Sequence, residues 1–161
     1  MTTQAERIGF IGLGNMGRPM AANLVRKGFP LVVLDTAPAR MEPLAALGAR
    51  MAGSLAELVD ASDITVTMLP DTPDVERIVL GAAGVLERGR PGMLHLDTST
   101  IAPAASRAMA ERLAARGIRF VDAGVGRSPA HAERGESLFM VGAEDADMER
   151  VRPLLEAMGD R

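Results

Sequence analysis

Three glycines near the start of the chain restrict its possible folds more than any other feature. Gly12, Gly14 and Gly17 form the pattern G-x-G-x-x-G, directly after the apolar run 8–11 and at the start of a helical pattern. In a strand–turn–helix unit of this kind, the first glycine permits a tight turn and the second lets the backbone approach a pyrophosphate. The third allows close packing of the helix on the strand. The pattern predicts a dinucleotide site, and a purely structural glycine turn is the alternative.

An acidic residue ends the second apolar run, where such a site needs one. A carboxylate at Asp35 can accept hydrogen bonds from the ribose hydroxyls of a dinucleotide. The same charge would repel a ribose 2′-phosphate, so the sequence favours NAD as the cofactor over NADP. Arg40 is near enough in sequence to weaken this preference, unless it is simply a solvated helix residue.

Short apolar runs alternate with longer amphipathic segments along the whole chain, a pattern typical of βαβ units. The expected strands are 8–11, 31–34, 64–68, 93–96, 118–121 and 138–141, and the expected helices are 16–27, 38–47, 54–61, 73–80, 103–115 and 146–158. This alternation predicts an α/β fold of the Rossmann type, a doubly wound and mainly parallel sheet with helices on both faces. We expect residues 1–161 to form a single dinucleotide-binding domain.

Composition excludes several other classes of protein. The net charge of −3 gives no broad positive field that would attract nucleic acid or an anionic membrane. The absence of cysteine excludes disulfides and thiolate metal sites and fits a reducing compartment such as the cytoplasm. Two isolated histidines have no metal-ligand spacing, so no metal site is expected. The polar start of the chain and the glycines in the next apolar run predict neither a signal peptide nor a membrane span.

Four segments together carry a family resemblance over essentially the whole chain. They are "IGFIGLGNMGRPMAANL", "TMLPD", "LDTST" and "VDAGVGRSPAHAERGESLFMVGA". The set resembles the β-hydroxyacid dehydrogenases, the family of 3-hydroxyisobutyrate dehydrogenase and tartronate semialdehyde reductase. The resemblance implies reversible NAD(P)-dependent oxidation of a short 3-hydroxy acid, with hydride passing between the carbinol carbon and the nicotinamide.

The resemblance also implies which residues bind the cofactor and the substrate. The implied cofactor residues are Gly12, Leu13, Gly14, Asn15, Met16, Gly17, Asp35, Leu69, Pro70 and Thr100. Asn15 and Met16 would contact the pyrophosphate, Leu69 and Pro70 the adenine side, and Thr100 the nicotinamide end. The implied substrate residues are Ser99, Gly126, Arg127 and Ser128. The hydroxyls of Ser99 and Thr100 have an alternative role, which is to cap the helix that follows.

Arg127 departs from the family pattern. The family has Ser-Gly-Gly where this chain has Gly126, Arg127 and Ser128, and that stretch surrounds the substrate carboxylate. A guanidinium offers a planar fork of donors suited to carboxylate, sulfonate or phosphate. The variant resembles the branch that includes sulfolactaldehyde reductase, in which an arginine here contacts the sulfonate. We therefore expect a three-carbon anionic substrate, with sulfonate slightly ahead of carboxylate. The alternative is a surface arginine paired with Glu133 or Asp122.

No residue of the chain matches the family's catalytic lysine, which the resemblance places in a second, all-helical domain. Lys27 is the only lysine and falls at the far end of the first expected helix. His95 is expected to be a packed strand residue, and His131 to be a loop residue without an orienting partner. We therefore expect the helical domain to be absent from these 161 residues and the chain alone to be inactive.

Other interpretations of the sequence stay open. One is a stand-alone NAD-binding module without chemistry of its own. Another is an imine reductase, since these enzymes share a similar glycine signature, but Asp35 argues against their usual preference for NADP. A chain without the helical domain is also expected to expose apolar surface and to self-associate.

Overall fold

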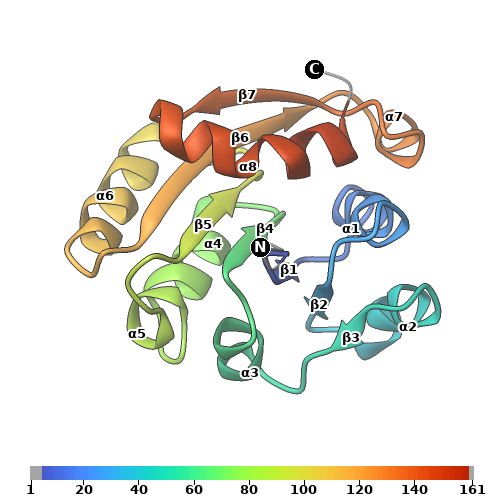
Figure 1. Ribbon diagram of the computed structural model, residues 1–161, viewed down its shortest axis with the longest axis horizontal. Coiled ribbons are helices and arrows are strands. Elements are labelled where there is room, and N and C mark those ends of the chain that lie inside the picture. The colour runs from blue at the N-terminus through green and yellow to red at the C-terminus, as the bar shows by residue number, and fades with distance from the viewer. Residues whose placement is uncertain (1–4, 160–161) are drawn as a thin grey trace.

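The computed structural model describes residues 5–159, which contain one seven-stranded sheet (Figure 1). The strands are β1 (Ile8–Ile11), β2 (Leu31–Leu34), β3 (Arg50–Met51), β4 (Ile64–Thr67), β5 (Leu94–Asp97), β6 (Arg119–Gly126) and β7 (Leu138–Gly142). They lie in the order β3-β2-β1-β4-β5-β6-β7, and only the last pair, β6 with β7, is antiparallel. The strand order reverses between β1 and β4, which confirms the Rossmann-type α/β fold.

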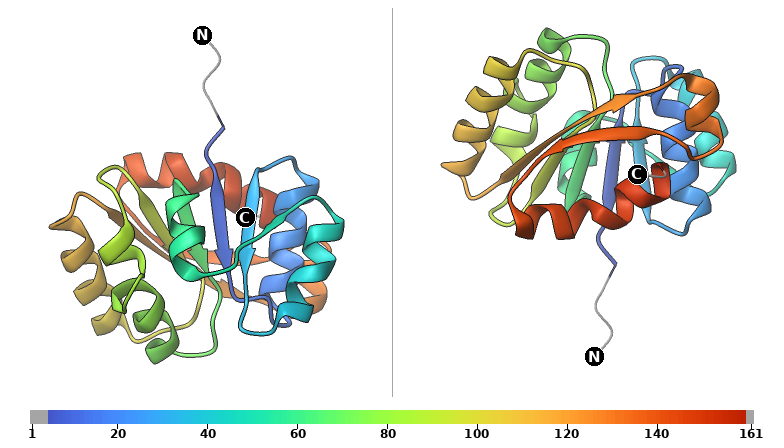
Figure 2. Two further views of the ribbon diagram at one scale, coloured as in Figure 1. Left: turned by 90° about the horizontal axis from the view of Figure 1, so that it is seen from below. Right: turned by 90° about the horizontal axis from the view of Figure 1, so that it is seen from above.

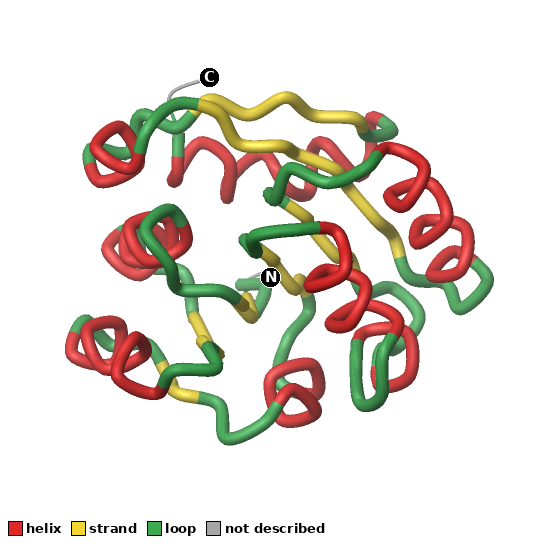
Figure 3. The backbone as a smooth tube through the Cα atoms, turned by 180° about the vertical axis from the view of Figure 1, so that it is seen from behind, coloured by secondary structure: helices red, strands yellow, loops and turns green. Residues whose placement is uncertain are grey.

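Helices cover both faces of the sheet, as Figures 2 and 3 show. One face carries α1 (Gly17–Arg26), α2 (Pro38–Ala46), α7 (Pro129–Glu133) and α8 (Asp145–Met158), and the other carries α3 (Leu55–Asp60), α4 (Thr72–Leu80), α5 (Val85–Arg88) and α6 (Pro103–Ala114). Each face has its own apolar cluster. On β1, Phe10 belongs to one cluster and the adjacent Ile11 to the other. Because both faces are buried, β1 and β2 carry no polar side chain and do not alternate between apolar and polar residues.

The structure extends the sequence prediction at three short elements and corrects it at one segment. β3, α5 and α7 were not expected, because elements of two to five residues carry no clear periodicity. β6 continues to Gly126, so residues 122–126, which lie beyond the expected strand 118–121, are a strand as well. Gly124 and Gly126 pair there with Met140 and Leu138 of β7. Glycine is uncommon inside strands, so the residue types alone did not indicate this pairing. Within the described residues, no helix is both long and apolar enough to span a membrane.

Candidate functional site

The three glycines after β1 have conformations and surroundings that suit their expected roles. Gly12 has a φ of +99°, and a Cβ there would overlap the carbonyl oxygen of Met68. A Cβ at Gly17 would overlap the Gly12 carbonyl oxygen and lie 3.3 Å from Cε1 of Phe10. A Cβ at Gly14 would have no protein atom within 4 Å, because this part of the turn faces open space. The turn thus packs tightly on the protein side and leaves the Gly14 backbone accessible to a ligand.

The start of α1 is suited to an anion. Its N-cap residue is Met16, no side chain caps it, and its first turn holds no acidic residue. The amide of Arg18 donates to the carbonyl of Gly14 at 3.0 Å and Pro19 has no N–H, so among the first three residues of α1 only Gly17 can offer an amide to a ligand. The macrodipole adds partial positive charge at this end. A phosphate beside Gly14 would meet both the Gly17 amide and the dipole.

A cavity of about 540 Å³ opens between the glycine turn, the end of β2, the loop after β4 and α4. Its lining includes Gly12, Gly14, Asn15, Met16, Gly17, Asp35, Leu69 and Pro70, so the fold brings most of the expected cofactor residues together. Leu13 is buried, and Thr100 is exposed outside this cavity. Thr36, Asp74, Arg77 and Ile78 also line it, although the sequence did not single them out. The sequence feature that could have identified the three of them in α4 is the amphipathic helix that follows the "TMLPD" loop.

Asp35 joins the end of β2 to the glycine turn. Its side chain is 6% exposed, and its Oδ2 accepts a 2.8 Å hydrogen bond from the amide of Leu13. Oδ1 accepts another of 2.8 Å from the amide of Ala37 and lies 3.8 Å from Nη1 of Arg40. Arg40 is 56% exposed, so this ion pair adds little stability, but it places a cation at the cavity wall.

The expected substrate residues lie outside that cavity, at the ends of β5 and β6. The amide of Val125 donates to the carbonyl of Thr98 at 3.1 Å, and a Cβ at Gly124 would lie 4.0 Å from the carbonyl oxygen of Ser99. The loop after β5 therefore lies directly beside the glycine-rich end of β6.

Ser99 and Thr100 differ in environment. Ser99 is 1% exposed, and its Oγ accepts a 2.8 Å hydrogen bond from the amide of Leu69, whereas Thr100 is exposed. The alternative that they cap the next helix is wrong, because the N-cap of α6 is Ala102, whose amide donates to Oγ1 of Thr72 rather than to either of these residues.

Arg127 has a left-handed backbone, with a φ of +70°. An L-residue in this region is strained by about 1–2 kcal/mol relative to the right-handed form, so the family's glycine would fit more easily. The Arg127 side chain is exposed, and its Nη1 donates to the carbonyl oxygen of Glu136 at 2.8 Å.

Two expectations for His131 need correction. It lies in α7 rather than in a loop, and it has an orienting partner, because its Nδ1 is 2.8 Å from Oγ of Ser128.

The remaining histidine and the lysine lie where the sequence indicated. His95 is fully buried, and burial lowers its pKa to about 3. It is thus a packed, neutral imidazole at physiological pH. Lys27 is exposed at the C-cap of α1, the end of that helix away from the glycine turn.

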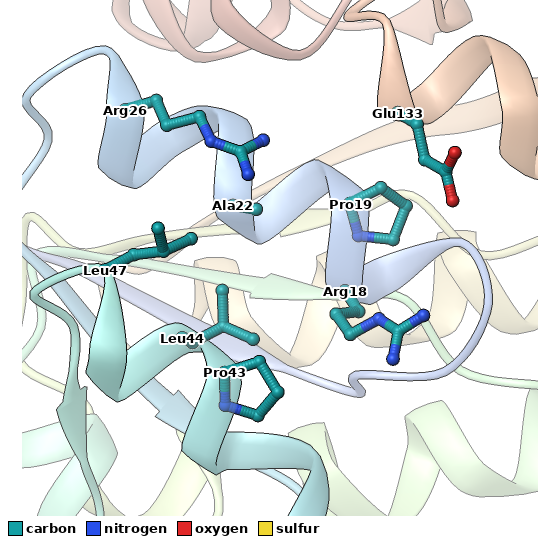
Figure 4. Close-up of a pocket in the computed structure, with 8 residues that line it drawn as sticks. All are labelled: Arg18, Pro19, Ala22, Arg26, Pro43, Leu44, Leu47 and Glu133. Atoms are coloured by element: carbon teal, nitrogen blue, oxygen red, sulfur yellow. The ribbon is translucent and has the colours of Figure 1, made fainter.

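A second cavity, of about 420 Å³, lies between α1, α2 and α7 (Figure 4). It is lined by Arg18, Pro19, Ala22, Arg26, Pro43, Leu44, Leu47 and Glu133, none of which the sequence indicated as a site residue. It lies among helix surfaces and not at the carboxyl ends of the strands, where ligands of open α/β sheets bind.

Comparisons with known proteins agree with this geometry. Residues 7–161 match the family described as the NAD binding domain of 6-phosphogluconate dehydrogenase. The NAD-dependent L-serine dehydrogenase of Pseudomonas aeruginosa is 41% identical over 96% of the chain and 52% of the relative. A probable mitochondrial 3-hydroxyisobutyrate dehydrogenase of Dictyostelium discoideum is 39% identical over 98% of the chain and 49% of the relative. The chain thus spans about half the length of these curated relatives.

A solved structure is similar over the same part of the molecule. It is 3-hydroxyisobutyrate dehydrogenase of Mycobacterium tuberculosis with L-serine, which is 35% identical and superimposes with a TM-score of 0.91. The match covers 98% of this chain and 53% of that one.

Proposed function

Since the chain belongs to the β-hydroxyacid dehydrogenase family as its NAD-binding domain, we propose that it serves an NAD-dependent oxidoreductase. Its reaction is hydride transfer between NAD(H) and a short anionic 3-hydroxy acid or the corresponding aldehyde. The observation that carries the proposal is the open space at Gly14, beside an uncapped helix start and inside a cavity of about 540 Å³. These features fit a dinucleotide pyrophosphate.

Each part of the cofactor has candidate partners in this proposal. The amides around Gly14, Asn15 and Met16 hold the pyrophosphate, and Asp35 accepts from the ribose hydroxyls. Leu69 and Pro70 contact the adenine side, and the apolar lining of that wall supports this assignment. Thr100 lies toward the nicotinamide, beyond the cavity. When bound, NAD supplies the hydride acceptor or donor that no amino-acid side chain can provide.

Arg127 holds the anionic end of the substrate in this proposal, with Gly126 and Ser128 beside it. Support comes from the left-handed backbone of Arg127, since residues kept in strained conformations cluster at ligand sites. The relatives are named for 3-hydroxyisobutyrate and L-serine, both small 3-hydroxy acids with a carboxylate. A sulfonate presents the same charge to the guanidinium and suits its donor fork equally well.

We also propose that residues 1–161 are the dinucleotide-binding domain and that none of the described residues, 5–159, is the acid–base residue of the reaction. Lys27 lies at the far end of α1, and His95 has a pKa of about 3, so neither can exchange a proton with a substrate oxygen near neutral pH. This observation keeps a second candidate function in view, a stand-alone NAD-binding module.

The purified chain is therefore expected to bind NADH without oxidising it. The test mixes the chain with NADH and a panel of three-carbon aldehydes that bear a carboxylate or a sulfonate. The loss of NADH absorbance measures turnover, and a full-length relative such as the L-serine dehydrogenase serves as the active control. Turnover by these 161 residues would contradict the assignment of the proton-transfer residue to another domain. An open reading frame downstream of the Arg161 codon that encodes a lysine-bearing helical domain would favour the dehydrogenase over the module.

Self-association through the β7 edge is part of the same proposal. Met140 is 72% exposed and Leu138 36% exposed on this edge strand, where the backbone can also pair with another chain. We expect the sedimentation coefficient to rise with concentration and Met140→Lys to suppress the rise. Met51→Lys is the matched control, because Met51 is 39% exposed on the opposite edge strand, β3. A monodisperse monomer at all concentrations would refute self-association.

A further inference from the structure

A row of buried polar side chains runs along β4 and β5 toward the cofactor cavity. Thr65 and Thr67 belong to β4, and His95 and Asp97 occupy the paired positions on β5. All four side chains are fully buried. Buried polar groups are costly unless they are hydrogen-bonded, so a continuous row of them needs an explanation beyond packing.

The hydrogen bonds in this row have a fixed direction. Thr67 Oγ1 donates to Oδ1 of Asp97 at 2.8 Å and lies 2.9 Å from Nε2 of His95. Because a hydroxyl has one proton, Thr67 must accept from a protonated Nε2. Nδ1 then accepts from Thr65, whose Oγ1 is 2.7 Å away. A neutral imidazole with its proton on Nε2 is therefore assigned, in agreement with the pKa of about 3 that burial gives His95.

Ser99 connects this row to the cavity wall. Its amide donates to Oδ1 of Asp97 at 3.1 Å, and its own Oγ accepts from the amide of Leu69 at 2.8 Å. Leu69 lines the cavity, and its Cδ2 lies only 2.8 Å from where a Cβ on Gly12 would be. Ser99 thus fastens the loop after β4 to the loop after β5, at the point where the former meets the glycine turn.

We propose that Ser99, held in place by Asp97 and Thr67, is a positioning residue for the cofactor wall at Leu69 and not a ligand of the substrate. This inference rests on the proposed NAD site and reassigns one residue that the family resemblance gives to the substrate. The Ser99 hydroxyl is 1% exposed and already accepts a hydrogen bond, so it is poorly placed to meet a substrate. If Leu69 loses this anchor, the cavity wall loses its fixed position, and cofactor affinity falls.

The first test compares two buried serine-to-alanine variants. Ser99→Ala is expected to weaken NADH binding by about tenfold, the change produced by one hydrogen bond of ordinary strength. Ser62→Ala is the matched control: Ser62 is fully buried and donates to the carbonyl of Leu58, at the opposite end of β4. It should lose stability and keep its NADH affinity. A substrate-binding role for Ser99 predicts instead that Ser99→Ala leaves NADH affinity unchanged, and this result would overturn the proposal.

The second test asks whether Thr67 and Ser99 act through one path. Thr67→Val keeps the shape of the side chain and removes its hydroxyl, so it should weaken NADH binding in the same direction as Ser99→Ala. The effects of substitutions within one hydrogen-bond network are not additive. The double variant should therefore bind NADH no more weakly than the single variant with the larger loss of affinity. Two independent, additive losses of affinity would contradict a shared path.

Two further readouts need no cofactor and therefore separate this inference from the proposed function. Hydrogen exchange at the Leu69 amide should be slow in the unmodified chain, fast in Ser99→Ala and unchanged in Ser62→Ala. Nitrogen NMR should show His95 protonated at Nε2 only, with no change between pH 5 and pH 8. If the chain bound no NADH, the proposed function would fail, while the Leu69 exchange rates would still decide whether Ser99 anchors this loop. Equal exchange rates in the unmodified chain and Ser99→Ala would refute the inference.

Discussion

Replacing Arg127 with alanine in the complete enzyme is expected to raise KM for the anionic substrate at least tenfold and to leave NADH affinity unchanged. The expected size follows from the loss of a charge-assisted hydrogen bond, which contributes roughly 1.5–3 kcal/mol. NADH affinity should hold because Arg127 follows β6 and does not line the cavity at the glycine turn. Steady-state kinetics with carboxylate and sulfonate aldehydes, together with an NADH titration, measure both quantities.

Three companion variants separate the Arg127 side chain from its backbone. Arg127→Lys keeps the charge but loses the planar fork, so its KM should be intermediate. Arg127→Gly should show the same rise in KM as Arg127→Ala. Its free energy of unfolding should be about 1 kcal/mol higher than that of Arg127→Ala, because glycine tolerates a positive φ. Arg134→Ala is the matched control, since Arg134 is an exposed arginine of the same segment that pairs with Glu136. Wild-type KM and NADH affinity in Arg127→Ala would make Arg127 an ordinary surface residue.

Replacing Asp35 with alanine should reduce the preference for NADH over NADPH by about tenfold or more, as expected for a charge-assisted hydrogen bond to a ribose hydroxyl. The carboxylate also holds the amides of Leu13 and Ala37, so part of any loss in NADH affinity would come from the turn itself. Asp35→Asn removes the charge and keeps an oxygen acceptor, so it should admit NADPH with less damage to the turn.

Arg40 provides the opposing variant. It is the cation nearest to Asp35 at the cavity wall, so Arg40→Ala should weaken NADPH binding more than NADH binding and widen the preference. Calorimetric titration of the unmodified chain and of the three variants with both cofactors gives the affinities needed. If the ratio of NADH affinity to NADPH affinity were the same in Asp35→Ala as in the unmodified chain, the Asp35 carboxylate would not discriminate between the two riboses.

Features that depend on a few neighbouring residues could be predicted from the sequence. The glycine turn followed from G-x-G-x-x-G, because each glycine meets a steric need set by its immediate neighbours. Asp35 was expected at the end of β2 for the same local reason. In each of these cases the residue type determines the local conformation or hydrogen bond.

Features that depend on distant partners could not be predicted. Gly124 is in a strand because β7 pairs with it, and the buried hydroxyl of Ser99 accepts from the amide of Leu69, which belongs to another loop. The assignment of Ser99 to the substrate came from motif position alone, which does not reveal what a hydroxyl contacts after folding. Arg127 is similar, since its hydrogen bond to the carbonyl of Glu136 depends on how the chain returns into β7.

The most direct test of the account is a calorimetric titration of the unmodified 161-residue chain with NADH and, separately, with NADPH. The geometry of Gly14, the start of α1 and Asp35 predicts saturable binding of one NADH per chain, about tenfold or more tighter than NADPH. Absence of NADH binding by the folded chain, or equal affinities for the two cofactors, would contradict it.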